Sequence, residues 1–223
     1  MITKKTNKQF IVCGTDTDIG KTLISAFMVR GLNSFYWKPI QSGIGSETDS
    51  QCVLRISEIN KKKIIKEAYM FREPVSPHWA AEIDQTNIEK DFLKLPNVDG
   101  SLVVETAGGL MVPLTRNFLQ IDQIKLWNLP VLLVCRSSLG TLNHTLLSIE
   151  ALKARKIKIL GLIINGEKHL DNPKTLKMFS KLPIIAEFPF INNINSNSLD
   201  ILWEDLNINE NLDLIFQSDN LYE

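Results

Sequence analysis

Short apolar runs recur along the chain, and residues typical of turns lie at their ends. The runs do not alternate between apolar and polar positions, which is typical of strands buried on both faces of a parallel sheet covered by helices. The predicted strands span residues 10–13, 35–37, 101–105, 130–135, 158–165 and 183–188. Segments with a helical period of apolar residues lie between them, most clearly at 22–32, 49–56 and 143–154.

This alternation of strands and helices predicts an α/β protein with a doubly wound, mostly parallel sheet flanked by helices. Residues 57–99 depart from the pattern because they carry three prolines and no clear period, so we expect helices or a lid there. No internal repeat, low-complexity tract or Gly/Ser linker divides the chain. Residues 1–223 are therefore predicted to form one domain.

The charge balance narrows the range of partners. Lys plus Arg and Asp plus Glu both count 25, so no net field attracts nucleic acid or an anionic membrane, and small molecules or other proteins are expected. No apolar run approaches the roughly 18 residues of a membrane span, and the start MITKKTNKQ lacks the apolar core of a signal peptide. The three cysteines show no metal-binding spacing and are predicted to be reduced thiols, which favours a cytoplasmic location.

The stretch FIVCGTDTDIGKTLIS, residues 10–25, places a glycine-containing loop between a predicted strand and a predicted helix. The usual phosphate-binding pattern has four residues between its glycines, whereas five separate Gly14 from Gly20 here. The physical requirements are still met, because a strand-to-helix turn offers backbone amides to phosphate, and Lys21 and Thr22 supply an ammonium group and a hydroxyl. The alternative is a glycine turn with a chance Lys-Thr. We predict a sheet of the P-loop NTPase type.

Two carboxylates are candidates for the Mg²⁺ that accompanies a nucleotide, because Mg²⁺ prefers oxygen ligands. Glu105 ends the run SLVVE, at the carboxyl end of a predicted strand, and Asp49 begins a predicted helix. The alternatives are a solvated acid for Glu105 and a helix N-cap for Asp49. Lys38 follows another predicted strand, where the residue alone would indicate a surface lysine.

These motifs and several others occur in the order and spacing found in dethiobiotin synthetases. The matching segments are GTDTDIGKT (14–22), WKPIQSG (37–43), TDS (48–50), EPVSPH (73–78), VVETAGGLMVPL (103–114), SSLGTLNHTLL (137–147) and IIN (163–165). The chain thus resembles this family from about residue 8 to residue 191. The resemblance implies a homodimeric, ATP- and Mg²⁺-dependent cyclo-ligase of biotin synthesis, which converts 7,8-diaminononanoate and CO2 or bicarbonate into dethiobiotin.

The resemblance also implies roles for residues at matching positions. Lys38 would connect the substrate carbamate to the γ-phosphate as the main catalytic residue, and Lys21 would bind the β- and γ-phosphates. Thr17 and Ser42 would lie near the reacting groups, Ser42 as a substrate contact. Gly140 and Asn143 would meet the substrate carboxylate from the neighbouring subunit, which places the active site at the dimer interface. An ordinary helix cap remains the alternative for Asn143.

By the same resemblance, the metal would be held by Thr22, Asp49 and Glu105. The residues expected to contact ATP are Asp18, Ile19, Gly20, Lys21, Thr22, Leu23, Asp49, Glu105, Gly108, Asn165 and Pro189. Asn165 and Pro189 match positions that bind the adenine base, although each would otherwise be read as an ordinary loop residue.

The chain also departs from the family pattern. Relatives commonly carry Glu-Gly-Ala-Gly-Gly where this chain has ETAGG at 105–109, so Thr106 is expected to narrow the approach of phosphate or substrate if the backbone lies close to them. Residues 166–181 lack a tyrosine that meets the substrate carboxylate in some relatives.

The main rival hypothesis is a nucleotide-switch ATPase of the partitioning type, which shares the fold and much of the loop. Such proteins carry a signature lysine five residues before the loop lysine, and Asp16 occupies that position here. The C-terminal stretch is acidic rather than basic and amphipathic, which also argues against a membrane-placement protein.

Overall fold

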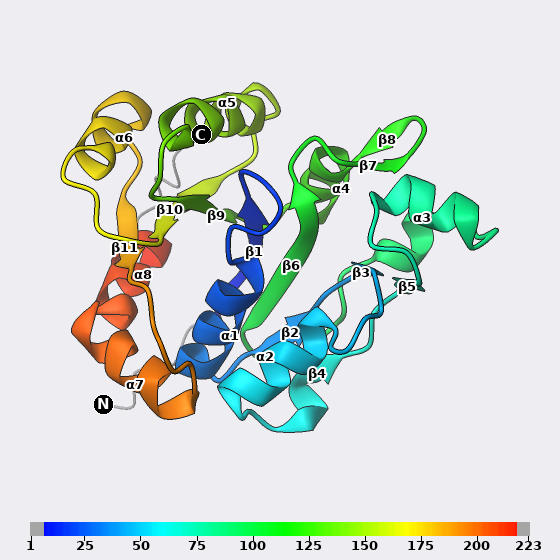
Figure 1. Cartoon of the computed structure of the whole chain (residues 1–223), viewed down its shortest axis with the longest axis horizontal. Coiled ribbons are helices and arrows are strands. Elements are labelled where there is room, and N and C mark those ends of the chain that lie inside the picture. The colour runs from blue at the N-terminus through cyan, green and yellow to red at the C-terminus, as the bar shows by residue number, and fades with distance from the viewer. Residues whose placement is uncertain (1–6, 218–223) are drawn as a thin grey trace.

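The computed structural model describes residues 7–217, and its centre is a seven-stranded sheet in the order β11-β10-β9-β1-β6-β2-β4 (Figure 1). Every pairing between neighbouring strands of this sheet is parallel. The strands are β1 (Gln9–Gly14), β2 (Phe35–Trp37), β4 (Ile64–Ile65), β6 (Leu102–Gly109), β9 (Val131–Arg136), β10 (Ile159–Asn165) and β11 (Ile184–Phe188). The predicted doubly wound α/β class is confirmed.

Helices cover both faces of the sheet (Figure 1). One face carries α1 (Lys21–Leu32), α2 (Asp49–Ser57), α7 (Ser196–Asp205) and α8 (Ile208–Gln217). The other carries α4 (Gln120–Trp127), α5 (Thr141–Ala154) and α6 (Asn172–Ser180). Because successive side chains of a strand point to opposite faces, Phe10 and Val12 of β1 join the first apolar cluster, whereas Ile11 and Cys13 join the second.

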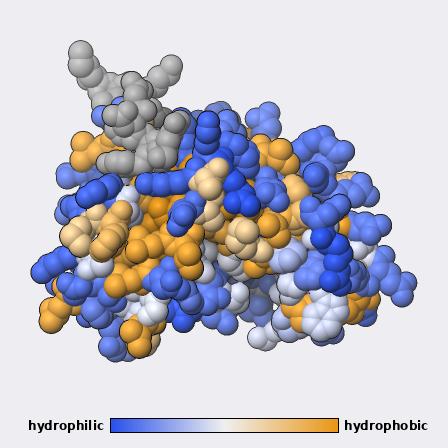
Figure 2. Space-filling model, turned by 90° about the horizontal axis from the view of Figure 1, so that it is seen from above, coloured by the Kyte–Doolittle hydropathy of each residue, from blue (hydrophilic) through white to orange (hydrophobic). Residues whose placement is uncertain are grey.

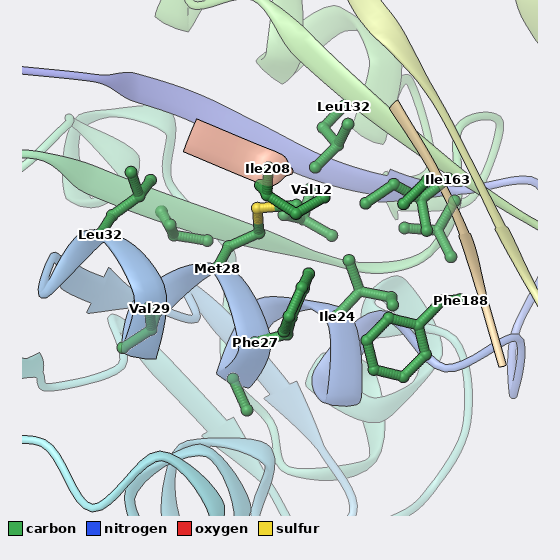
Figure 3. Packing of buried hydrophobic residues seen from close by; sticks show 14 of the residues in the cluster. Val12, Ile24, Phe27, Met28, Val29, Leu32, Leu132, Ile163, Phe188 and Ile208 are labelled. Carbon is green, nitrogen blue, oxygen red and sulfur yellow. The ribbon is translucent and has the colours of Figure 1, made fainter. Parts of the chain in front are cut away.

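Helix α1 is anchored at the middle of the sheet by its apolar face (Figure 3). Ile24, Phe27 and Met28 are fully buried, and the ring centroid of Phe27 lies 5.0 Å from that of Phe188 and 5.2 Å from that of Trp203. Burying one such side chain stabilises a fold by about 1.5–3 kcal/mol. This packing fixes the N-terminus of α1, and with it the glycine-containing loop, at the carboxyl end of β1.

The predicted strands are confirmed with small shifts of their ends, apart from 101–105, which continues to Gly109 as β6. Helices α4, α6, α7 and α8 were not predicted, and each of them buries at most three hydrophobic side chains. Four short strands outside the main sheet were not predicted either: β3 (Ile40–Ser42), β5 (Tyr69–Phe71), β7 (Pro113–Thr115) and β8 (Phe118–Leu119).

Residues 57–99, expected to hold helices or a lid, contain β4, β5, α3 (Pro77–Ile83) and the 3-10 turns Lys61–Lys63 and Lys90–Leu93. Helix α3 lies with the short strands beside the main sheet (Figure 1). A third apolar cluster, which includes Ile40, Phe71 and Leu114, packs beneath it. The helix expectation is confirmed by α3.

The three cysteines are free, as predicted, and Cys13 and Cys135 are buried. Within residues 7–217, no helix is both long and apolar enough to cross a membrane.

Candidate active site

The loop between β1 and α1 is closely packed at its two glycines, Gly14 and Gly20. Gly20 adopts a left-handed conformation (φ 91°), and a Cβ atom there would lie 2.2 Å from Asn165 Nδ2. At Gly14, a Cβ would lie 2.6 Å from Ile19 Cδ1. Contacts this short do not occur in real structures, so the lack of space favours glycine at both positions, and the left-handed backbone favours it further at Gly20.

Three polar contacts hold this loop in place. Lys21 Nζ donates to the carbonyl oxygen of Asp16 at 2.8 Å, and Asn165 Nδ2 donates to that of Ile19 at 2.8 Å. The carboxylate of Asp16 pairs with the Arg136 guanidinium at 3.0 Å. Asn165, at the end of β10, therefore has a contact with the loop that its expected role at the adenine base did not indicate.

Lys38 lies at the centre of a buried polar cluster. Its side chain is 5% exposed, and Nζ lies 2.7 Å from Asp49 Oδ2 and 3.0 Å from Glu105 Oε1. Nζ also donates to the carbonyl oxygen of Thr106 at 3.2 Å. The alternative of a surface lysine is wrong, because the neighbouring strand β6 and the start of α2 supply acceptors that remove this ammonium group from solvent.

The two candidate carboxylates lie in this same cluster. Glu105 is fully buried in β6, and Thr22 Oγ1 donates to its Oε1 at 2.9 Å, so the solvated alternative for Glu105 is wrong. Asp49 is the first residue of α2, whose N-cap is Thr48, so the N-cap alternative for Asp49 is also wrong. The backbone N–H of Asp49 donates to Gln41 Oε1 at 3.2 Å, which ties the start of α2 to β3.

The charges of this cluster shift one another's pKa values. Burial alone would lower the pKa of Lys38, but the carboxylates of Glu105 and Asp49 outweigh it, and that pKa is raised. For Lys21, burial and then the nearby charge of Lys38 lower the pKa. Burial opposes ionisation of Asp49, yet Lys38 and its hydrogen bond lower the pKa of this carboxyl. Lys38 is therefore a charged ammonium group at neutral pH.

The donor set of this cluster suits Mg²⁺. Thr22 and Lys38 both contact Glu105 Oε1, and Lys38 also contacts Asp49, which brings one hydroxyl and two carboxylates together beside the loop. Mg²⁺ is commonly bound by one or two carboxylates, with waters and substrate phosphates completing its octahedron. Over residues 7–217 there is no group of three or more His, Cys, Asp or Glu side chains placed to hold a metal ion.

A cavity of about 730 Å³ opens over the loop and the cluster. Its lining includes the predicted site residues Thr17, Asp18, Gly20, Lys21, Thr22, Lys38, Ser42, Asp49, Glu105 and Gly108. Ser42 Oγ is buried there without a hydrogen-bond partner among the described residues, as expected of a group that contacts a ligand.

Six predicted residues do not line this cavity: Ile19, Leu23, Gly140, Asn143, Asn165 and Pro189. Ile19 is buried, and its carbonyl oxygen accepts from Asn165. Gly140 is the N-cap of α5 and Asn143 lies exposed in its first turn, so the helix-cap alternative for Asn143 is wrong. The expected roles of these residues remain predictions.

Comparisons with known proteins agree with this geometry. A family profile described as "AAA domain" matches residues 8–198. The ATP-dependent dethiobiotin synthetase BioD of Rhodopseudomonas palustris (strain HaA2) is 46% identical over 192 residues, which cover 86% of this chain and 90% of the relative. The chain belongs to the dethiobiotin synthetase family. Proteins of the same name from Nitrobacter hamburgensis and Brucella anthropi are 44% and 42% identical, each over 86% of this chain and over 90% and 91% of their own lengths.

Solved structures of other proteins share the fold. A ParA family ATPase from Chlorobium tepidum superposes with a TM-score of 0.51 at 10% identity, covering 95% of this chain and all of that one. A plasmid partition protein from Borrelia burgdorferi gives a TM-score of 0.52 at 14% identity, covering 92% and 99%. At such low identity these two neighbours indicate the P-loop NTPase-type fold and no shared activity.

Eight further residues that line the cavity were not among the predicted site residues. They are Ile40, Gln41, Pro74, Val75, Ser76, Pro77, Ala107 and Val112. The motif EPVSPH (73–78) was a usable signal, because its match to the family pointed to a role that strand and helix patterns did not.

Thr106, the departure from the family's Glu-Gly-Ala-Gly-Gly pattern, does not narrow the cavity. Its side chain is 1% exposed and does not line the cavity, and Oγ1 donates to the carbonyl oxygen of Val12 at 3.3 Å. The expected obstruction is wrong, because alternation along β6 turns this side chain to the opposite face of the sheet from the cavity-lining residues Glu105 and Ala107.

Replacing Thr106 with glycine is therefore expected to leave the KM values for ATP and diamine within about twofold, because no ligand contact is removed. The free energy of unfolding should fall by about 1–2 kcal/mol, since a glycine weakens a strand interior and the bond to Val12 is lost. Steady-state kinetics and denaturant unfolding measure both quantities, with Thr106→Ser as the control that keeps the hydroxyl. A glycine variant with a markedly lower KM would contradict the inward placement of this side chain.

Proposed function

We propose that this chain closes the ureido ring of dethiobiotin, consuming ATP, CO2 and 7,8-diaminononanoate. The observation that carries the proposal is the buried ammonium of Lys38, held between Asp49 and Glu105 beside the phosphate loop. A cation at this place can face both a nucleotide phosphate and a substrate anion. Membership of the dethiobiotin synthetase family agrees with ATP-dependent ring closure.

The proposed reaction has three bond-making steps. One amine of the diamine adds to CO2 and gives a carbamate. A carbamate oxygen then attacks the γ-phosphorus of ATP, ADP leaves, and a carbamic-phosphoric anhydride results. The second amine attacks the carbonyl carbon, phosphate departs, and the cyclic urea forms. The carbamate oxygen carries no proton, so the phosphoryl step needs alignment and charge stabilisation rather than a general base.

The residues at the cavity are suited to these tasks. We assign to Lys38 the alignment of carbamate and γ-phosphate, and to Lys21 the stabilisation of the β- and γ-phosphates. Support comes from the lining of the cavity, which includes both lysines. Thr17 and Ser42 are assigned to the reacting groups, and the unpaired hydroxyl of Ser42 is free to bond a substrate amine or carbamate.

We further propose that Thr22, Asp49 and Glu105 hold Mg²⁺ together with the phosphates of ATP. Bound there, Mg²⁺ would neutralise charge on the phosphate oxygens that it coordinates. For the nucleotide itself, the assigned contacts are Asp18, Ile19, Gly20, Leu23, Gly108, Asn165 and Pro189, in addition to Lys21 and the metal set.

We propose a homodimer in which Gly140 and Asn143 of one subunit meet the substrate carboxylate in the cavity of the other. Leu139, beside Gly140, is fully exposed, and Leu147 of α5 is 58% exposed. Figure 2, which views the molecule from above Figure 1, displays apolar residues gathered on this side. Exposed apolar surface near the N-terminus of α5 is what a subunit interface would cover.

The chain is proposed to act as a single catalytic domain in the cytoplasm, with ATP, CO2 and the diamine as its small-molecule partners. One continuous seven-stranded sheet supports a single domain, and three free thiols support a cytoplasmic location. The partitioning-type ATPase is the weaker candidate, because Asp16, at the signature-lysine position, is paired with Arg136 and presents no cation.

Phosphate release from Mg-ATP, measured with and without 7,8-diaminononanoate and bicarbonate, tests the proposal. Release is expected only when both substrates are present, and mass spectrometry should detect the cyclic urea. ATP hydrolysis at the same rate with and without the diamine, and without formation of the urea, would overturn the proposed activity and favour a nucleotide switch.

A further inference from the structure

Tyr36 is a buried residue of β2 whose hydroxyl reaches the polar cluster. It is fully buried, and its hydroxyl donates to Glu105 Oε2 at 2.9 Å. In the pairing of β2 with β6, Tyr36 lies opposite Val103, and both residues belong to the apolar cluster on one face. Glu105 lies two residues beyond Val103 on that face, a diagonal distance that an aromatic side chain spans.

This bond divides the two oxygens of Glu105 between different neighbours. Oε2 accepts from Tyr36, whereas Oε1 accepts from Thr22 at 2.9 Å and from Lys38 at 3.0 Å. Burial, followed by the charge of Glu105, raises the pKa of Tyr36 well above its ordinary value, so the phenol remains a donor. A carboxylate bonded at one oxygen by a rigid ring loses its freedom to rotate.

We propose that Tyr36 is a positioning residue that orients Glu105, so that Oε1 faces Thr22 and the cavity. This inference rests on the proposed role of Glu105 at Mg²⁺. Hydrogen bonds from outside the ligand set hold coordinating carboxylates in their working orientation, and losing such a partner costs roughly 10- to 100-fold in metal affinity or activity. Without the phenol of Tyr36, Glu105 would keep its charge and its contacts at Oε1 but would lose the bond that holds Oε2.

The test compares Tyr36→Phe with Tyr69→Phe, a matched control. The Tyr69 hydroxyl accepts a backbone bond from Glu89 at 2.9 Å, and Tyr69 does not line the cavity. Calorimetry measures the affinity for the nonhydrolysable analogue AMP-PNP with excess Mg²⁺ and with EDTA. In Tyr36→Phe, the gain in affinity that Mg²⁺ produces should fall about tenfold, with the EDTA value unchanged. Tyr69→Phe should match the unaltered protein in both conditions.

An equal loss of affinity with Mg²⁺ and with EDTA would overturn the inference, because a merely structural role moves both values together. Turnover adds a second measure. Raising Mg²⁺ should recover most of the lost activity of Tyr36→Phe, so the Mg²⁺ concentration at half-maximal rate rises while kcat stays close to that of the unaltered protein.

Glu105→Gln separates this inference from the proposed metal site. If Glu105→Gln leaves the effect of Mg²⁺ intact, the proposed metal role is wrong and the inference about Tyr36 is overturned with it. If Glu105→Gln removes that effect and Tyr36→Phe does not reduce it, only the inference about Tyr36 is overturned. In the Glu105→Gln background, Tyr36→Phe should change nothing further. A further loss of Mg²⁺-dependent affinity in the double variant would contradict action through Glu105.

Discussion

Lys38→Ala is expected to lower kcat by roughly 10³-fold or more, because charge stabilisation in phosphoryl transfer contributes 10²–10⁵-fold per positioned group. The affinity for ATP should change far less, since the proposed nucleotide contacts of Lys21 and the loop backbone do not involve Lys38. The assay is multiple-turnover phosphate release at saturating substrates, together with calorimetric ATP binding. Lys62→Ala, at an exposed lysine of a 3-10 turn, is the matched control and should retain full turnover.

The same substitution is expected to destabilise the protein. Glu105 is fully buried and would lose its cationic partner, and removing one member of a buried ion pair costs about 3–5 kcal/mol. Thermal unfolding must therefore be measured together with the kinetics. It shows whether Lys38→Ala is folded at the assay temperature, so that a loss of turnover can be assigned to the folded protein. Turnover by folded Lys38→Ala comparable to that of the control would remove Lys38 from the mechanism.

Gly20→Ala is the second substitution with a large expected effect: the affinity for ATP should fall by at least about tenfold. A left-handed conformation costs an alanine about 1–2 kcal/mol, and 1.4 kcal/mol corresponds to a factor of ten. The added Cβ would also lie 2.2 Å from Asn165 Nδ2, so Asn165 must move and release its bond to Ile19. The loop then loses the contact that ties it to β10.

Gly45→Ala is the matched control for this substitution, because a Cβ at Gly45 meets no heavy atom within 4 Å. Calorimetric titration with ATP measures the affinity of each variant. Gly45→Ala should bind ATP as tightly as the unaltered protein, whereas Gly20→Ala should bind it at least about tenfold more weakly. The double variant Gly20→Ala/Asn165→Ala relieves the steric clash but not the backbone strain. Its affinity for ATP should therefore remain low. ATP affinity in Gly20→Ala equal to that of the control would show that this loop is not the phosphate cradle.

Much of the fold was predictable because its signals are local. A strand buried on both faces needs an apolar run, and β1, β9 and β10 each have one. The phosphate loop is also local, since the chemistry of residues 14–22 lies in one turn. Helices α7 and α8 were not predictable in the same way, because they bury few residues and depend on a sheet face assembled from distant strands.

The candidate site divides along the same line. Glu105 was found at the end of a predicted strand and Lys38 through a motif matching the family, but their contact spans 67 positions and no local pattern indicates it. The contact between Tyr36 and Glu105 spans 69 positions and followed from no motif. Thr106 was misjudged because its direction depends on the register of β6 against β1.

By itself, the sequence determined which residue types follow which strands, and therefore the α/β class, the phosphate loop and the family. Those properties depend on the order of residues along the chain, and they can therefore be recognised from hydrophobic periodicity and from the spacing of motifs. Only the tertiary structure decided that Lys38 lies buried between Asp49 and Glu105, that Asn165 holds the loop, and that Thr106 points away from the cavity. These facts arise where the parallel strands end side by side, because the pairing of strands, and not their spacing in the chain, brings the side chains together.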